Sequence, residues 1–286
     1  MTAKMRKKPS TPDPPRQHEL VLGESSSKAI RPSRARAPAA QREQRALQDA
    51  LITEGVLAVK LAAKSLNVDE FSKALINGLT QNSLETRRRY SQSLSRWFLH
   101  DGIDGFLPRV WRAYEDDAIL LDLLRYSYLA HEPILAACVA ECLLPLENGI
   151  AIPSTYFDTF LARKLGSAPP RDTKKRLKIN LKRLGFLSRA KGQPDRLVPI
   201  NPTGTSFLLL LHHLFAAKEL RTVEVRALLA NPFWIYLGFK DPSVIRQLLR
   251  QADAAGVVAK YVVADQLDQV TTCFSEDEIL EQKVRI

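Results

Sequence analysis

Nine lysine and arginine side chains gather within residues 171–191, and Asp172 is the one acidic residue among them. Cations at this density can bind phosphate groups, because the counterions that they release give an affinity that falls with salt. Ordinary solvated helices mix both signs of charge, since opposite charges four residues apart stabilise a helix by about 0.2–0.5 kcal/mol. The segment therefore favours a polyanion as partner. Nucleic acid is the first candidate, and an acidic protein or a solvated basic face are the alternatives.

Leucines place these cations on a helix. At 100° per residue, Leu177, Leu181 and Leu184 fall within about 60° of one another and predict a buried stripe. Asp172, with Thr173, is expected to cap the helix, and Gly185 to end it. Asn180 could in principle pair with an adenine edge. Its position beside the leucine stripe instead predicts a role in packing or capping.

The cations occupy the remaining faces of this helix. Lys174, Lys178 and Lys182 follow one flank, Lys175 lies opposite the leucines, and Arg176 and Arg183 lie on the other flank. A second cluster, Arg87 to Arg89, falls in the first turns of a helix that Asn82 or Ser83 can cap. Arginines there oppose the helix dipole, which an external anion could compensate. The candidate nucleic-acid-binding residues are Arg87, Arg88, Arg89, Lys174, Lys175, Lys178, Lys182, Arg183, Arg189 and Lys191.

The elements that must position these residues occur in a recognisable order. A short β-compatible run at 150–152 is followed by two helices and then by strand, turn and strand up to residue 200. That is the order of a winged helix-turn-helix, in which the second paired helix reads DNA and the hairpin is the wing. A similar order recurs after residue 203 with fewer cations. Its candidate recognition helix carries Arg246 and Arg250 together with the acidic Asp253. We expect this second unit to have a structural or dimerising role.

The predicted fold is mainly α, with a helical N-terminal half and tandem winged-helix or helix-turn-helix-like units that carry small β-hairpin wings. We expect a disordered, basic, proline-rich tail at 1–44, a helical domain with a helix-turn-helix-like element at 45–146, and winged-helix-like units at 147–202 and 203–286. The formal charge of +11 is uneven. Residues 1–45 hold eleven Lys or Arg against four Asp or Glu, and residues 46–286 hold 31 against 27.

Other functional classes find less support. Cys138, Cys142 and Cys273 are too few for a disulfide framework and favour a reducing cytosol. His131 with Cys138 and Cys142 has metal-ligand spacing, but Pro133 interrupts the helix and no fourth ligand is evident. No phosphate-binding glycine loop, nucleophile elbow or H-E-x-x-H motif occurs. We therefore expect no catalytic residue, cofactor or metal. We also expect no secretory signal or membrane span, and a cytoplasmic protein.

Three stretches carry a resemblance to a known family: FSKALINGLTQNSLETRRRYSQSLSRWF, AILLDLLRYSYLAHEPILAACVAECL and DTKKRLKINLKRLGFL with the hairpin after it. Over residues 61–274 the chain resembles BrxA, the small helical accessory component of BREX phage-defence systems. The resemblance implies a non-enzymatic DNA-binding protein that acts beside a methyltransferase and ATPases. Its residues carry over to 86–89 and 173–183, and the basic tail departs from the family pattern.

The sequence thus predicts a protein that binds double-stranded DNA mainly through phosphates, in a phage-defence system with possible partners from that system. Two other functions stay open: a protein–protein adaptor in a defence complex, and a winged-helix transcriptional regulator.

Overall fold

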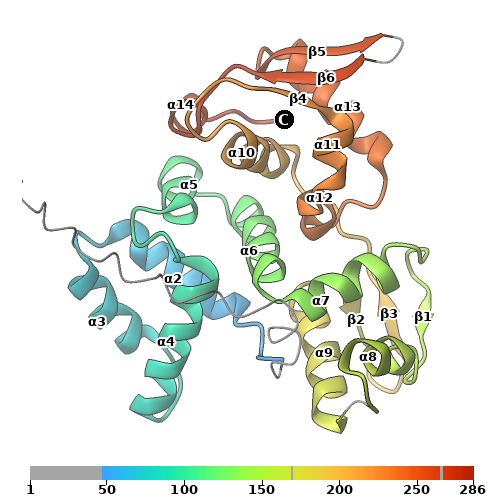
Figure 1. Cartoon of the computed structure of the whole chain (residues 1–286). Coiled ribbons are helices and arrows are strands. Elements are labelled where there is room, and N and C mark those ends of the chain that lie inside the picture. The colour runs from blue at the N-terminus through green and yellow to red at the C-terminus, as the bar shows by residue number, and fades with distance from the viewer. Residues whose placement is uncertain (1–46, 169, 265–266) are drawn as a thin grey trace, which may run out of the picture. The chain divides into compact units, whose positions relative to one another are not determined.

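A computed structural model describes residues 47–168, 170–264 and 267–286, all within one compact unit. The expected tail at 1–44 lies outside the described residues. The described part is mainly helical and carries two three-stranded antiparallel sheets (Figure 1). Its buried apolar side chains form one continuous cluster, so the three expected folded segments share a core.

The N-terminal helices are α2 (Ile52–Lys64), α3 (Val68–Gly78), α4 (Leu84–Phe98) and α5 (Phe106–Tyr114). Side-chain caps fix where two of them begin. Asn67 accepts the backbone N–H of Glu70 at the start of α3, and Ser83 accepts that of Thr86 at the start of α4. Ser83 is thus the cap among the two residues that the sequence allowed. This sets the phase of α4 and leaves the side chains of Arg88 and Arg89 exposed.

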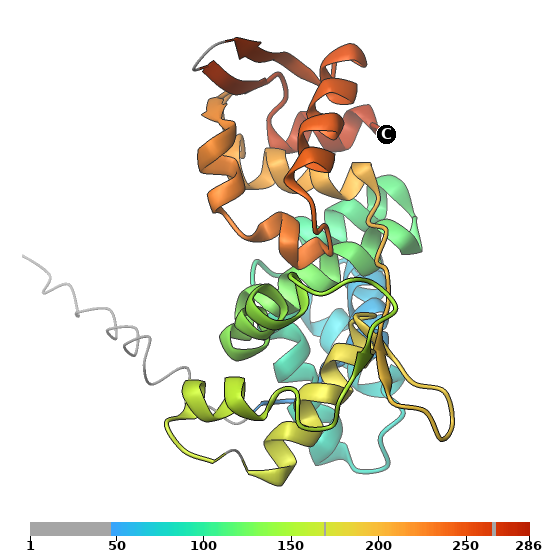
Figure 2. The ribbon, with the colours of Figure 1, turned by 90° about the vertical axis from the view of Figure 1, so that its right-hand side faces the viewer.

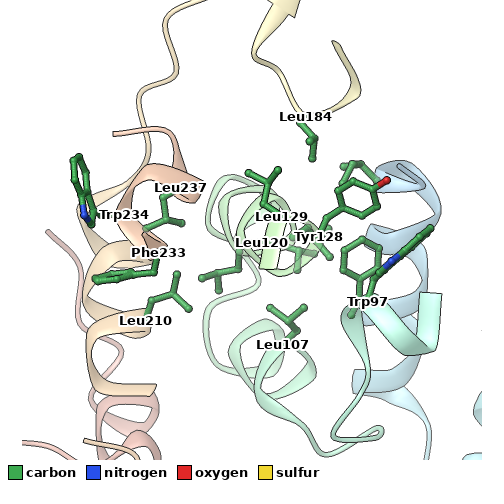
Figure 3. Close-up of a cluster of buried hydrophobic side chains, with 14 of the residues drawn as sticks. Trp97, Leu107, Leu120, Tyr128, Leu129, Leu184, Leu210, Phe233, Trp234 and Leu237 are labelled. Atoms are coloured by element: carbon green, nitrogen blue, oxygen red, sulfur yellow. The ribbon is translucent and has the colours of Figure 1, made fainter. Parts of the chain in front are cut away.

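Helix α6 (Asp117–His131) is the centre of the packing, in contact with α2, α4, α5, α7, α10 and α12. Figure 3 shows Leu120, Tyr128 and Leu129 of this helix between Trp97 on one side and Phe233 on the other. Tyr128 and Leu129 are fully buried. A charged residue on this helix must therefore find its partners inside the protein.

The apolar stretch breaks at Pro133, as predicted. Helix α7 (Pro133–Cys138) begins there, with the proline in the first turn, where its missing N–H is not needed. It continues into a π-helical turn, η1 (Val139–Leu143), which the sequence did not predict. No helix in the described ranges is long and apolar enough to cross a membrane.

The first sheet follows. Its elements are β1 (Ala151–Ile152), α8 (Asp158–Leu165), α9 (Arg171–Arg183), β2 (Leu187–Ser188) and β3 (Asp195–Leu197), with strand order β1-β3-β2. Helix α9 begins at Arg171, before the predicted cap at Asp172. Pro170 occupies the cap position without a side-chain hydrogen bond, so the predicted cap at Asp172 is wrong. The rigid φ of proline suits the start of a helix and moves Asp172 into the first turn. Gly185, at φ 83°, ends the helix as predicted.

The second sheet repeats this order, with strand order β4-β6-β5. Asp241 caps α13 by accepting the backbone N–H of Ser243, and Pro242 opens its first turn. The elements are α10 (Gly204–Phe215), β4 (Thr222–Glu224), α11 (Val225–Ala230), α12 (Phe233–Leu237), α13 (Pro242–Ala254), β5 (Val258–Ala264), β6 (Leu267–Thr272) and α14 (Glu276–Gln282).

A buried ion pair on α6 ties these segments together. Asp122 and Arg125 lie 2.9 Å apart, with side chains 9% and 13% exposed. Arg125 also donates to the carbonyls of Leu184, just after α9, and Leu237, at the end of α12. Asp122 accepts the backbone N–H of Thr203, which caps α10. One pair on the central helix thus holds the end of α9, the end of α12 and the start of α10.

Candidate nucleic-acid interface

The leucine stripe of α9 faces the core as predicted. Leu177 and Leu181 are fully buried and Leu184 nearly so. The helix therefore has a fixed rotation, and each of its cations has a definite neighbour or a definite exposure. These surroundings decide which cations can meet an external anion.

The lysine flank is paired within the protein. Lys174 Nζ lies 2.6 Å from a carboxylate oxygen of Asp158, the first residue of α8. Lys182 Nζ lies 2.7 Å from Asp195, and Lys178 Nζ lies 3.7 Å from it. Asp195 opens β3 and is 5% exposed, so both lysines compensate a buried carboxylate. Acidic residues of the same chain thus supply part of the opposite charge that α9 itself lacks.

The other flank of α9 holds the segment 47–51, which we call the N-terminal strap. Arg176 Nη1 donates to the Leu47 carbonyl at 2.9 Å, and Arg183 Nη1 to the Ala50 carbonyl at 3.2 Å. Between them, Asn180 accepts the backbone N–H of Ala50 at 2.8 Å and donates to the Gln48 carbonyl at 2.7 Å. Asn180 is fully buried, which agrees with the expected packing role and places it away from any base edge.

Tyr128 of α6 completes this attachment. Its hydroxyl donates to the Gln48 carbonyl at 2.8 Å and accepts from Asn180 at 3.3 Å. Burial raises the pKa of Tyr128, so the hydroxyl keeps the proton that it donates. The strap is thus fixed by three side chains of α9 and one of α6, although 130 residues separate Ala50 from Asn180.

The open face of the first sheet unit keeps unpaired cations. Arg171 and Lys175 of α9 are exposed, and the structure gives neither an ion pair among the described residues. The β2–β3 hairpin, whose loop projects outward in Figure 2, carries exposed Arg189 and Lys191. Arg189 donates to the Gln193 carbonyl within the hairpin. Residues 147–202 hold twelve Lys or Arg against four Asp or Glu, a net charge of +8.

The arginine cluster of α4 is divided in the same way. Arg87 Nη1 donates to the Ile76 carbonyl of α3 at 3.2 Å, so it joins two helices. Arg88 and Arg89 are exposed and have no ion pair within the described ranges. Arg89 and Arg176 line the same pocket, together with residues of the strap. The two clusters that the sequence predicted separately therefore meet at one place.

The second sheet unit is electrostatically different. Residues 203–286 hold nine Lys or Arg against ten Asp or Glu. On α13, Arg246 lies 3.0 Å from Asp268 of β6, and Arg250 is exposed. This helix offers an external phosphate much less positive charge than α9 does.

Possible metal ligands do not converge. Among the described residues, no group of three or more His, Cys, Asp or Glu side chains is arranged to hold a metal ion. Burial raises the pKa of Cys138, and a hydrogen bond from Cys138 lowers the pKa of Cys142. His131 Nδ1 instead lies 2.8 Å from the Ser127 carbonyl.

Sequence reasoning missed Arg171, Asp158 and Asp195 as parts of this site. Arg171 was omitted because the helix was expected to start after it. Asp195 could have been found, because the second strand of a hairpin that follows a helix returns beside that helix. Comparison of the chain with known protein families, with curated proteins and with solved structures finds no match in any of the three.

Proposed function

We propose that the protein binds duplex DNA mainly through phosphate contacts, with α9 and the β2–β3 hairpin as the contacting elements. The observation that carries the proposal is a set of three exposed cations, Arg171, Lys175 and Lys191, on the open face of a unit with net charge +8. None of the three has an ion pair with another described residue. Support comes also from the order α7-β1-α8-α9-β2-β3 and the strand order β1-β3-β2. We read this order as a winged helix, with α9 as recognition helix and the hairpin as wing.

The internal ion pairs indicate which residues contribute most to the affinity for DNA. Lys178 and Lys182 both pair with Asp195, and Lys174 pairs with Asp158. The charges of these three lysines are therefore already partly neutralised within the protein. A phosphate gains less from a cation that must leave or share a carboxylate. We therefore assign the main phosphate contacts to Arg171, Lys175 and Lys191, with a smaller part for the lysine flank.

Replacing Arg171, Lys175 and Lys191 together by Gln should weaken duplex binding roughly tenfold to hundredfold at moderate salt. The slope of log K against log salt should become shallower by about 3, since each lost phosphate contact removes about 0.9. The measurement is fluorescence anisotropy with a labelled duplex across a salt series. Unlike changes at Lys182, which pairs with Asp195, these three substitutions remove no ion pair between described residues.

The matched control is the triple variant Arg226→Gln, Arg250→Gln and Lys260→Gln. It removes the same charge from exposed positions of the second sheet unit. We expect it to keep the wild-type slope. Equal loss in both triple variants would mean that only net charge matters, and the assignment to α9 and the hairpin would be wrong.

The biological setting is proposed from the resemblance of residues 86–89 and 173–183 to BrxA: an accessory role in a phage-defence system. If that setting is right, the variant with Gln at 171, 175 and 191 should lose protection that the wild-type gene gives within its defence locus. A single palindromic footprint near the protein's own promoter would favour a transcriptional regulator instead.

An adaptor function is the second candidate, and the β5–β6 hairpin favours it. Val263 and Leu267 flank the turn of this hairpin and are 59% and 52% exposed. Their unit carries no excess of positive charge. Apolar side chains at such a projecting position are suited to a protein partner.

Changing Val263 and Leu267 together to Ser should release a defence-system partner that co-purifies with the wild type, while duplex affinity stays unchanged. Leu220→Ser is the control, since Leu220 is also 59% exposed in the same unit. Retention of the partner by the double variant would exclude this hairpin as the docking surface.

A further inference from the structure

A pocket of about 200 Å³ opens where the N-terminal strap, α4 and α9 meet. Arg89 and Tyr90 of α4 line it, with Ser93 one turn further along, and Arg176 lines it from α9. Gln48 and Asp49 of the strap form the rest of the polar wall. The pocket thus lies between the two basic clusters, in a part of the molecule to which no function has yet been given.

Two arginines supply its positive charge. Arg89 is exposed and has no ion pair among the described residues. Arg176 uses Nη1 to hold the Leu47 carbonyl, and its guanidinium makes no other hydrogen bond within the described part of the chain. A guanidinium has five N–H donors in a planar fork that matches the oxygens of a phosphate. Both side chains can therefore turn donors toward an anion in the pocket.

Neutral donors stand beside these arginines. The side-chain oxygen of Gln48 accepts from Arg96 Nη2 at 2.9 Å and from Ser93 Oγ at 3.5 Å. With that oxygen occupied, the amide group of Gln48 has its N–H donors left. Tyr90 is half-buried and adds an aromatic ring with a hydroxyl. Such a mixture of cations, amide and hydroxyl is suited to phosphate oxygens.

Asp49 is the one carboxylate on the wall, and it opposes an anion. Its oxygen lies 3.7 Å from Arg183 Nη1, on the side of the strap that faces α9. Arg183 thus offsets part of the Asp49 charge from outside the pocket. With two arginines against one partly compensated carboxylate, the wall keeps a positive balance.

We propose that this pocket binds a phosphodiester group of a nucleic-acid backbone, with Arg89 and Arg176 on the same phosphate. This inference rests on the proposed DNA binding and deepens it, because it gives α4 and α9 a shared contact. A phosphate is smaller than the pocket, which leaves room for part of an attached sugar. The bound phosphate would hold α4 against α9 and secure the strap between them.

The first test needs no duplex. The probe is the dinucleotide dTpdT, which has one phosphodiester, and thymidine and inorganic phosphate are the comparison ligands. The indole N–H resonance of Trp97, which also lines the pocket, reports occupancy by NMR. We expect a saturable shift with dTpdT, a weaker one with phosphate and none with thymidine. Arg89→Gln should abolish the shift, and Arg226→Gln, at an exposed arginine of the second sheet unit, should keep it.

The second test uses a labelled duplex and a salt series. Arg89→Gln and Arg176→Gln should each make the slope shallower by about 1, and the double variant also by about 1, because one phosphate is lost in every case. A loss of about 2 in the double variant would place the arginines on two phosphates and overturn the proposal. So would an unchanged dTpdT shift in Arg89→Gln. A saturable dTpdT shift without salt-dependent duplex binding would refute the proposed function and leave the pocket standing.

Discussion

Replacement of Asp122 by Ala should lower the free energy of unfolding by about 3–5 kcal/mol. The change leaves the Arg125 guanidinium buried without its carboxylate. It also removes the acceptor of the Thr203 backbone N–H and of the Ser206 hydroxyl, at 2.8 and 3.1 Å. Urea unfolding followed by circular dichroism measures the loss.

The matched control is Asp104→Ala. Asp104 also pairs with an arginine at 2.9 Å, Arg112, but its side chain is 79% exposed. Exposed pairs contribute about 0–1 kcal/mol, so this variant should remain close to the wild type. If Asp122→Ala were equally mild, water would have to reach Arg125, and the pair could not be what joins α9, α10 and α12.

The order of elements was readable from local signals. Ser83 begins a helix where the sequence predicts one, and Gly185 ends a helix at positive φ as expected. Such signals are strong because they satisfy backbone groups within a few residues of the chain. The mainly helical fold with small three-stranded sheets follows from them. Leu177 and Leu181 are buried for a similar reason, since helical spacing alone decides which face is apolar.

Local signals in the sequence do not predict the polar contacts between residues that lie far apart in the chain. The sequence does not predict the contacts of Asp122 and Arg125, because nothing nearby in the chain shows what they bind. The sequence shows no acidic partner for Lys178 and Lys182, because Asp195 follows them by more than ten residues in the chain. Charge patterns within one helix report pairs at i, i+4 and miss partners that a hairpin brings back.

These contacts give the faces of α9 different roles. Its leucines bury it, one flank binds carboxylates of the same unit, and the other flank binds the strap. The open face, with Arg171 and Lys175, and the pocket side of Arg176 remain for an external anion. The nine cations of residues 171–191 are therefore several structural groups and a smaller number of candidate phosphate contacts.

Asn180→Ala tests the attachment of the strap to α9, with an expected loss of about 2–5 kcal/mol in the free energy of unfolding. The side chain is fully buried. Its removal leaves the Ala50 N–H without its hydrogen-bond acceptor and leaves the Gln48 carbonyl with the Tyr128 hydroxyl as its donor. A buried polar group without its partner costs about 1–3 kcal/mol, and the lost side-chain volume adds a cavity.

Two measurements separate this role from a general weakening of the helix. Hydrogen exchange at the Ala50 amide should become much faster in Asn180→Ala, because that N–H loses its acceptor. Lys175→Ala, on the exposed face of the same helix, should change stability by no more than about 0.5 kcal/mol and leave Ala50 protected. Unchanged protection of Ala50 in Asn180→Ala would show that the Asn180 side chain is not what holds this amide of the strap. That result would leave the attachment of the strap to Arg176 and Arg183, of which Arg176 also lines the pocket between α4 and α9.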